Sequence, residues 1–128
     1  MSRHCEIVVH SDFYDFIGLD VECVIQLFVK KHKEIKKWAY ILHDKDEGMP
    51  HYHIYLYFGV NGPDYETVAK WFIVPSRCVG AIRGSFNDYL LYLVHFGRKC
   101  KHQYSPREVK ASFDFESALS KDVLSNRW

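Results

Sequence analysis

The 128-residue sequence lacks the features of several specialised protein classes. No apolar run approaches the ~20 residues that a membrane-spanning helix needs, and the first residues have no signal-peptide pattern. No internal repeat, linker or low-complexity segment is recognisable. Hydrophobic residues make up 48% of the chain and aromatic residues 16%, which excludes a disordered chain. The sequence therefore predicts one folded domain over residues 1–128, with a substantial core.

Cysteine is scarce and scattered. The four cysteines include no C-x-x-C pair, and their spacing completes no zinc-binding set. A disulfide framework is typical of small secreted domains that are dense in cysteine. We therefore expect four reduced thiols in an intracellular, cytoplasmic protein.

A net charge of +1 excludes a strong overall positive field for attracting nucleic acid. The charge is nevertheless uneven, because residues 96–110 carry five basic side chains against Glu108 alone. These basic residues are Arg98, Lys99, Lys101, Arg107 and Lys110. They are candidate contacts for phosphate groups. The lysines of residues 30–37 are explained by a predicted helix end, where cations complement the helix dipole.

The spacing of apolar residues predicts four strands and three helices. The strands are expected at residues 5–10, 37–43, 51–58 and 78–82. The helices are expected to begin after the capping residues Asp20, Asp64 and Ser85. The last of these helices is expected to run to about residue 96, with Gly97 as its stop. Residues 113–128 are expected to form a C-terminal helix or the start of a linker.

This order of elements predicts an α+β fold. Adjacent antiparallel strands with short connections form a sheet, and helices cover it. We expect an antiparallel sheet flanked by helices of ferredoxin-like (RRM-like) type. The helices are expected on one face, which leaves the other face exposed.

A histidine-bearing hairpin is the most informative part of the chain. Residues 37–43 and 51–58 are joined by a short polar loop containing glycine and proline, so they should pair antiparallel. That pairing places His43 beside His51. His51 and His53 share one strand face, about 7 Å apart, because side chains alternate at a period of two. Three imidazoles are therefore expected to converge.

The loop of this hairpin adds carboxylates to the same place. Asp44, Asp46 and Glu47 all follow the first strand, and the sequence does not decide which of them lies nearest the imidazoles. Mixed nitrogen and oxygen ligands suit a divalent ion such as Mn²⁺ or Mg²⁺ better than a closed structural zinc site. The hairpin therefore predicts a metal site. The alternative is a polar hairpin tip with solvated histidines.

Tyrosines on the third predicted helix are candidates for chemistry. Tyr89, Tyr92 and His95 follow at intervals of three, so neighbours in this series share a helix face. The same spacing also suits core packing. A phenol with a pKa of about 10 needs a base or an electrophile to attack at neutral pH. A metal-polarised phosphate would be that electrophile, and His95 or Lys99 could bind phosphate or handle the proton.

Two other functions fit part of the pattern. A binuclear metallohydrolase would use His-x-His-x-Asp, but Tyr55 occupies the aspartate position and no further histidine-rich segment follows. A non-catalytic, ferredoxin-like module for single-stranded nucleic acid would stack bases on Tyr55 and Tyr57. That function would leave the imidazoles of the hairpin without a purpose.

Three motifs, taken together, resemble a known family. The chain has Leu-His-Asp-Lys-Asp at 42–46, His-Tyr-His at 51–53 and Tyr-Leu-Val-His at 92–95. This order and spacing resemble the replication initiator (Rep) proteins of rolling-circle plasmids, in the HUH (His-hydrophobic-His) endonuclease superfamily, and the streptococcal-type plasmid Rep family in particular. The similarity runs from about residue 5 to about residue 115. Many relatives have a lysine three residues after the tyrosine, whereas this chain has His95, as in the plasmid subgroup.

The resemblance implies roles for individual residues. The positions that match the ligands of Mn²⁺ or Mg²⁺ are His43, Asp46, His51 and His53. Tyr92 matches the nucleophile, because it is followed by Leu-x-His as the family pattern requires, whereas Tyr89 is not. The implied activity is that of a metal-dependent DNA endonuclease and strand transferase. It forms a 5′-phosphotyrosine link and leaves a free 3′-hydroxyl that primes rolling-circle replication.

The resemblance also implies a partner, single-stranded DNA at a replication origin, and no membrane. We expect the strand to cross the exposed sheet face towards the metal, along the basic residues. The candidate DNA contacts are Arg83, His95, Arg98, Lys99 and Lys101. Relatives usually carry a further oligomerisation or helicase region, and this chain has no G-x-x-x-x-G-K-[ST] motif of an ATPase. An oligomer would form through a region absent from this chain.

Overall fold

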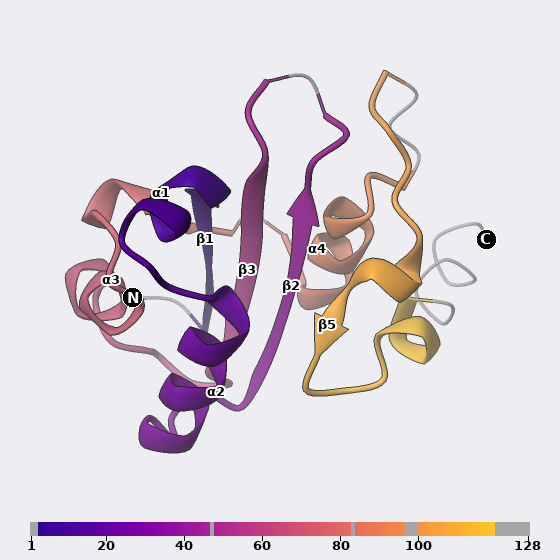
Figure 1. Ribbon diagram of the computed structural model, residues 1–128. Coiled ribbons are helices and arrows are strands. Elements are labelled where there is room, and N and C mark those ends of the chain that lie inside the picture. Colours follow the sequence, from indigo (N-terminus) through magenta and orange to yellow (C-terminus); the bar gives the residue numbers. More distant parts are fainter. Residues whose placement is uncertain (1–2, 47, 83, 97–99, 120–128) are drawn as a thin grey trace.

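A five-stranded antiparallel sheet forms the centre of the domain (Figure 1). The structure is a computed structural model that describes residues 3–46, 48–82, 84–96 and 100–119. The strands lie in the order β4-β1-β3-β2-β5. Their bounds are β1 His4–His10, β2 Lys37–His43, β3 His51–Tyr57, β4 Val79–Ala81 and β5 Lys110–Ala111. The predicted α+β fold and the four predicted strands are confirmed.

Helices connect and cover the strands. Among the described residues they are α1 Ser11–Phe16, α2 Val21–Lys31, α3 Tyr65–Phe72 and α4 Phe86–Leu93, with short 3-10 helices η1 Ser76–Cys78 and η2 Pro106–Glu108. The three predicted caps are confirmed. The side chains of Asp20 and Asp64 accept from backbone amides in the first turns of α2 and α3. Ser85 forms a capping box with Asp88 at the start of α4.

Helices pack on both faces of the sheet, so the expectation of helices on one face was wrong. One core joins α1, α2 and α3 to the sheet face that carries Ile54 and Leu56. A second core joins α4 and the C-terminal segment to the opposite face, around Tyr55. The physical reason lies in β3, whose residues are apolar or aromatic on both faces and are buried from His53 to Leu56. A strand with two apolar faces needs cover on both sides.

Three local elements differ from the expectation. α1 and β5 were not predicted, because six and two residues are too short for a periodic signal. α4 ends at Leu93 instead of about residue 96, since His95 adopts a left-handed backbone conformation with φ of 58°. The predicted stop, Gly97, lies outside the described residues. Residues 115–119 are helical, in line with the predicted C-terminal helix, and residues 120–128 lie outside the described part.

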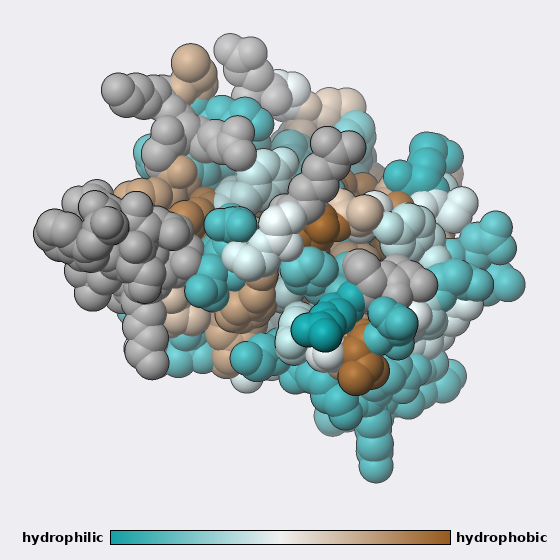
Figure 2. Space-filling model, turned by 180° about the vertical axis from the view of Figure 1, so that it is seen from behind, coloured by the Kyte–Doolittle hydropathy of each residue, from teal (hydrophilic) through white to brown (hydrophobic). Residues whose placement is uncertain are grey.

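The surface carries its large apolar side chains separately. Phe16, Leu27 and Val60 are among the exposed ones. Seen from behind, the domain is mostly hydrophilic, with hydrophobic residues in small separate patches (Figure 2). Scattered apolar residues are ordinary on folded domains. None of the described helices combines the length and the apolar character that crossing a membrane requires.

Replacing Ser85 with Ala is expected to lower the free energy of unfolding by about 1 kcal/mol. Ser85 Oγ accepts a hydrogen bond from the Asp88 backbone amide at 3.2 Å, and that bond would be lost. Chemical denaturation measures the change. Ser76→Ala, at an exposed serine outside the α-helices, is the control and should change stability by less than about 0.5 kcal/mol. Equal losses in the two variants would contradict this role of the cap.

Candidate metal and nucleophile site

The ends of three adjacent strands carry a row of histidines on one sheet face. The strand register pairs His51 of β3 with His10 of β1 on one side and with His43 of β2 on the other. The predicted contact between His43 and His51 is confirmed, with ring centroids 5.5 Å apart. The sequence did not single out His10, whose ring lies 6.5 Å from that of His51. The row marks this end of the sheet as the polar end.

His43, His51 and His53 form a compact cluster. The ring centroids of His43 and His53 are 4.4 Å apart, and those of His51 and His53 are 4.9 Å apart. One ring nitrogen from each residue lies within 4.8 Å of the other two. His43 and His53 are buried, whereas His51 is partly exposed. This spacing allows three nitrogen donors to share one ion.

Backbone carbonyls fix the protonation of two of these rings. His43 Nε2 lies 2.7 Å from the Leu93 carbonyl oxygen, and His51 Nδ1 lies 2.9 Å from that of Met49. Because a carbonyl only accepts, these two ring nitrogens carry the protons and donate. The lone pairs are therefore on His43 Nδ1 and His51 Nε2. Metal-binding histidines have this second hydrogen bond as a rule, and it orients the ring.

Two buried ring nitrogens, His43 Nδ1 and His53 Nδ1, have no hydrogen-bond partner among the described residues. Buried polar atoms are normally satisfied. His43 Nδ1 also lies 3.4 Å from Asp46 Oδ2, so a lone pair faces a carboxylate. Two electron-rich atoms at this distance repel each other unless a cation is present. The residues therefore fit a divalent metal ion.

Asp46 is the carboxylate that the structure brings to the imidazoles. Its Oδ2 lies 3.4 Å from His43 Nδ1 and 3.8 Å from His51 Nε2. Asp44, in the same loop, is exposed. Glu47 lies outside the described residues. Of the alternatives that the sequence left open, the geometry favours Asp46 over Asp44.

Burial lowers the pKa of two of the three imidazoles, those of His43 and His53. Burial, together with the neighbouring His43 and His51, lowers the pKa of His53 to about 2. Burial also lowers the pKa of His43, although its hydrogen bond to the Leu93 carbonyl acts in the opposite direction. An imidazole binds a metal only in its neutral form. These two rings therefore need to lose no proton before binding an ion at neutral pH.

His95 lies in the site, where the sequence predicted a contact to DNA phosphate or a group that handles the proton, but not a potential metal ligand. Its Nδ1 donates to the His102 carbonyl at 3.0 Å and lies 3.6 Å from Asp46 Oδ1. The residue is buried, and its φ of 58° is uncommon for a histidine. His43, Asp46 and His95 form a second group of potential ligand atoms within 4.8 Å of one another.

The two candidate nucleophiles of α4 have different surroundings. The Tyr89 hydroxyl donates to Glu6 Oε1 at 2.5 Å, in a buried position. Burial and Glu6 raise the pKa of Tyr89 well above its usual value. Tyr92 is half-buried, and its ring lies 5.5 Å from that of His53. The arrangement favours Tyr92 over Tyr89 as the accessible phenol.

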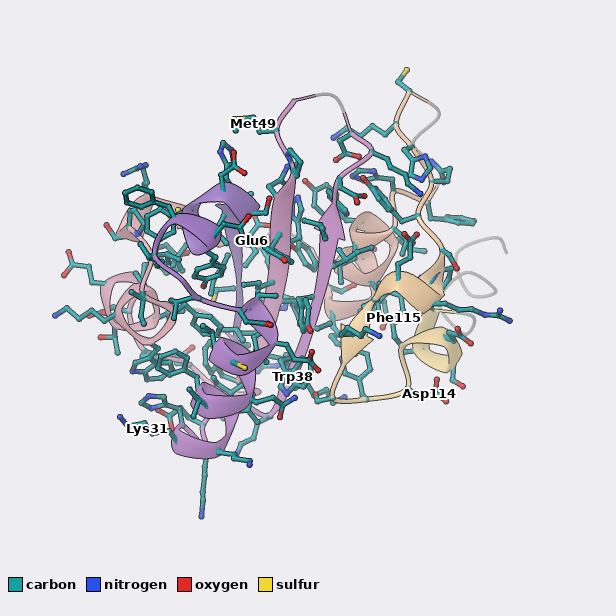
Figure 3. The ribbon with its side chains drawn as sticks, in the orientation of Figure 1. Glu6, Lys31, Trp38, Met49, Asp114 and Phe115 are labelled. Carbon is teal, nitrogen blue, oxygen red and sulfur yellow. The ribbon has the colours of Figure 1, made fainter. Side chains whose placement is uncertain are left out.

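A cleft of about 520 Å³ opens over the histidines. Its walls come from the β2–β3 loop, β3, α4 and the segment after α4. The loop and the segment after α4 project from the same end of the sheet (Figure 1). Met49, half-exposed in the β2–β3 loop, lies beyond the sheet at this end (Figure 3). The residues that line the cleft are Lys45, Asp46, His51, His53, Tyr92, His95, Cys100, Lys101 and His102.

The predicted DNA contacts divide into two groups. His95 and Lys101 line the cleft. Arg83, Arg98 and Lys99 lie outside the described residues, so their role stays a prediction. The sequence analysis missed Lys45, Cys100 and His102, which line the cleft from two different segments. Their proximity depends on how the segment after α4 folds back, and no motif signals that fold.

Tyr104 is a further residue of the site that the sequence analysis missed. It is 4% exposed and hydrogen-bonded to Asp46. Burial raises the pKa of Tyr104 to about 12, so its hydroxyl is a hydrogen-bond donor at neutral pH. The sequence alone does not show that the segment bearing Tyr104 contacts the hairpin loop, so nothing in it indicated a role for Tyr104 in the site.

Comparisons with known proteins agree with the motifs. Residues 19–117 match the family model described as plasmid replication protein, origin binding domain. The chain is also 32% identical, over 143 aligned positions, to a replication protein of Onion yellows phytoplasma (strain OY-M). That alignment covers 98% of this chain and 36% of the relative, so the chain spans about a third of the relative's length.

The class that these matches define is a domain of DNA-replication proteins. Within that class, the chain belongs to the family of plasmid replication protein origin-binding domains. The matched region includes the hairpin, α4 and the residues of the cleft. The family resemblance of the three motifs is thereby confirmed.

Acid is expected to destabilise the metal-free domain through its buried histidines. An unfolded histidine takes up a proton below a pH of about 6.5, whereas folded His53 stays neutral, so the unfolded state binds more protons. The free energy of unfolding should therefore fall as the pH drops from 7 to 5, by about 2 kcal/mol for His53 alone. Denaturant titrations at each pH, in the presence of a chelator, measure the free energy of unfolding.

The variant His53→Gln should reduce this pH dependence, since glutamine does not titrate. Tyr14→Phe is the control and should leave the dependence as in the wild type, because burial raises the pKa of this phenol and it does not titrate between pH 5 and 7. An unchanged slope in His53→Gln would show that folding does not lower the pKa of His53.

Proposed function

We propose that this domain binds a plasmid replication origin and cuts and rejoins one DNA strand there through Tyr92. One observation carries the proposal: Tyr92 of α4 and the imidazoles of the β2–β3 hairpin line the same cleft, although they are distant in the sequence. Membership of the origin-binding family supports DNA as the partner. A phenol beside a histidine cluster with two unsatisfied ring nitrogens suits phosphoryl transfer.

The residues that would hold a divalent ion, Mn²⁺ or Mg²⁺, are His43, Asp46, His51 and His53. A bound ion would draw negative charge away from a non-bridging phosphate oxygen. This would stabilise the transition state by several kcal/mol. The chain's own contribution is to orient the donor atoms. The carbonyls of Leu93 and Met49 orient two of the imidazoles before any ligand arrives.

The proposed reaction is a transesterification at a DNA phosphate. The Tyr92 hydroxyl oxygen attacks the phosphorus and the bond to the 3′-oxygen breaks, leaving a 5′-phosphotyrosine link and a free 3′-hydroxyl. The phenol loses a proton and the 3′-oxygen gains one, so protons balance. One phosphodiester replaces another, and the reverse reaction therefore joins strands without ATP. The free 3′-hydroxyl would prime rolling-circle replication.

The DNA strand would enter the cleft at the end of the sheet. A path across an open sheet face is wrong for this fold, because α4 and the C-terminal segment cover the face that carries the histidines. Lys45 and Lys101 line the cleft from its two walls and would neutralise backbone phosphates. The resemblance of the three motifs implies that this strand is single-stranded.

A non-catalytic base-stacking module is the weaker candidate. Tyr55, one of its two stacking residues, is fully buried, and its hydroxyl lies 2.9 Å from His4 Nδ1. Its ring packs against those of Phe86 and Tyr89. A base cannot reach that ring without displacing α4.

Replacing Tyr92 with Phe is expected to abolish the covalent protein–DNA adduct. The experiment incubates the protein with Mn²⁺ and a labelled single strand from the origin, and then separates the products on a denaturing gel. Tyr92→Phe should reduce the adduct at least about 1,000-fold, because the attacking oxygen is missing. DNA binding, measured by fluorescence anisotropy, should be unchanged.

Tyr89→Phe is the matched control for this experiment. It loses the hydrogen bond to Glu6, which lowers stability by about 1 kcal/mol, but it should keep the adduct. An adduct that persists in Tyr92→Phe and disappears in Tyr89→Phe would give the role to Tyr89.

Replacing His51 and His53 together with Ala is expected to weaken Mn²⁺ binding at least about 100-fold, because two of four donors are lost. Isothermal titration calorimetry at pH 7.5 measures the dissociation constant. The matched control is His4→Ala with His32→Ala, which also removes two imidazoles but no proposed ligand and no residue of the cleft. If the variant lacking His51 and His53 bound Mn²⁺ with wild-type affinity, these residues would not be ligands of the ion.

A further inference from the structure

A tyrosine outside the three motifs contacts both a proposed metal ligand and the loop that bears it. The Tyr104 hydroxyl donates to Asp46 Oδ1 at 2.8 Å and accepts from the Lys45 backbone amide at 3.0 Å. Its ring stacks on His43, with centroids 4.5 Å apart and an interplanar angle of 15°. One buried side chain therefore touches two of the four residues proposed to hold the ion.

The two oxygens of Asp46 have different neighbours. Oδ1 accepts from Tyr104 and lies 3.6 Å from His95 Nδ1. Oδ2 faces the nitrogens of His43 and His51 that carry lone pairs, at 3.4 and 3.8 Å. A hydrogen bond to a charged oxygen is stronger and shorter than one between neutral groups. The bond at Oδ1 therefore restricts rotation of the carboxylate and keeps Oδ2 directed at the imidazoles.

Tyr104 is itself held by the end of α4. Its backbone amide donates to the Val94 carbonyl at 3.1 Å, and its ring lies 5.5 Å from that of His95. Val94 follows directly on α4, the helix that carries Tyr92. The contacts of Tyr104 thus join the loop that bears Asp46 to the helix that bears the proposed nucleophile.

We propose that Tyr104 is a positioning residue that aims Asp46 Oδ2 at the imidazole lone pairs for metal binding. The inference rests on the proposed metal site. Hydrogen bonds that orient metal ligands typically change metal affinity 10- to 100-fold when they are removed. Tyr104 would therefore be as necessary for tight binding as some of the ligands, although it touches no ion.

The test is Tyr104→Phe, which removes the hydroxyl and keeps the ring that stacks on His43. By calorimetry with Mn²⁺ alone, its dissociation constant should rise about 10- to 100-fold, with the stoichiometry unchanged. The Mn²⁺-induced rise in the thermal midpoint, compared at one Mn²⁺ concentration, should shrink accordingly. That rise is measurable even if the variant is less stable than the wild type.

Tyr14→Phe is the matched control. Its buried hydroxyl donates to the Phe72 carbonyl at 2.8 Å, on the opposite side of the sheet. It should lower the thermal midpoint without changing the Mn²⁺ affinity. Wild-type affinity in Tyr104→Phe, or equal losses of affinity in both variants, would overturn the inference and leave the metal site standing. Failure of the wild type to bind Mn²⁺ would overturn the metal site and the inference together.

Discussion

The antiparallel pairing of β2 with β3 is the constraint on which the site depends. It sets His43 opposite His51 and leaves His53 on the same face. A shift of one residue would turn the histidines of β3 to the other face of the sheet. Burial on both sides prevents that shift, because Ile54 and Tyr55 point to opposite faces and are both fully buried. The two cores thus fix the register, and the register assembles the donors.

The buried histidines at the polar end of the sheet destabilise the fold, and apolar packing elsewhere offsets that loss of stability. His43 and His53 are buried with unsatisfied ring nitrogens, and His95 has a left-handed backbone. Each such feature destabilises the fold, by about 1–3 kcal/mol as a rule. These three histidines lie at one end of the sheet, whereas apolar packing continues along the remainder of the strands. This distribution is expected where a metal ion or a substrate supplies the missing partner.

Much of the fold and part of the site could be predicted from the sequence. The alternation of side chains along β3 and the short loop before it define the hairpin. The contact of His43 with His51 could therefore be predicted from neighbouring residues alone. The caps at Asp64 and Ser85 are local as well. The cover on the second sheet face and the contact of Tyr104 with Asp46 depend on how distant segments pack, and no short pattern encodes that. The motif, by contrast, singled out Tyr92, which lines the cleft, and its role as the nucleophile stays a prediction.

The central claim is that Tyr92 itself becomes bonded to DNA, and mass spectrometry tests it most directly. The protein is incubated with Mn²⁺ and an origin strand, the DNA is trimmed by nucleases, and the protein is digested with a protease. The account predicts one modified peptide, with the residual nucleotide attached through a 5′-phosphate to Tyr92. A nucleotide on Tyr89, Tyr104 or a serine, or cleaved DNA with no modified peptide, would contradict it.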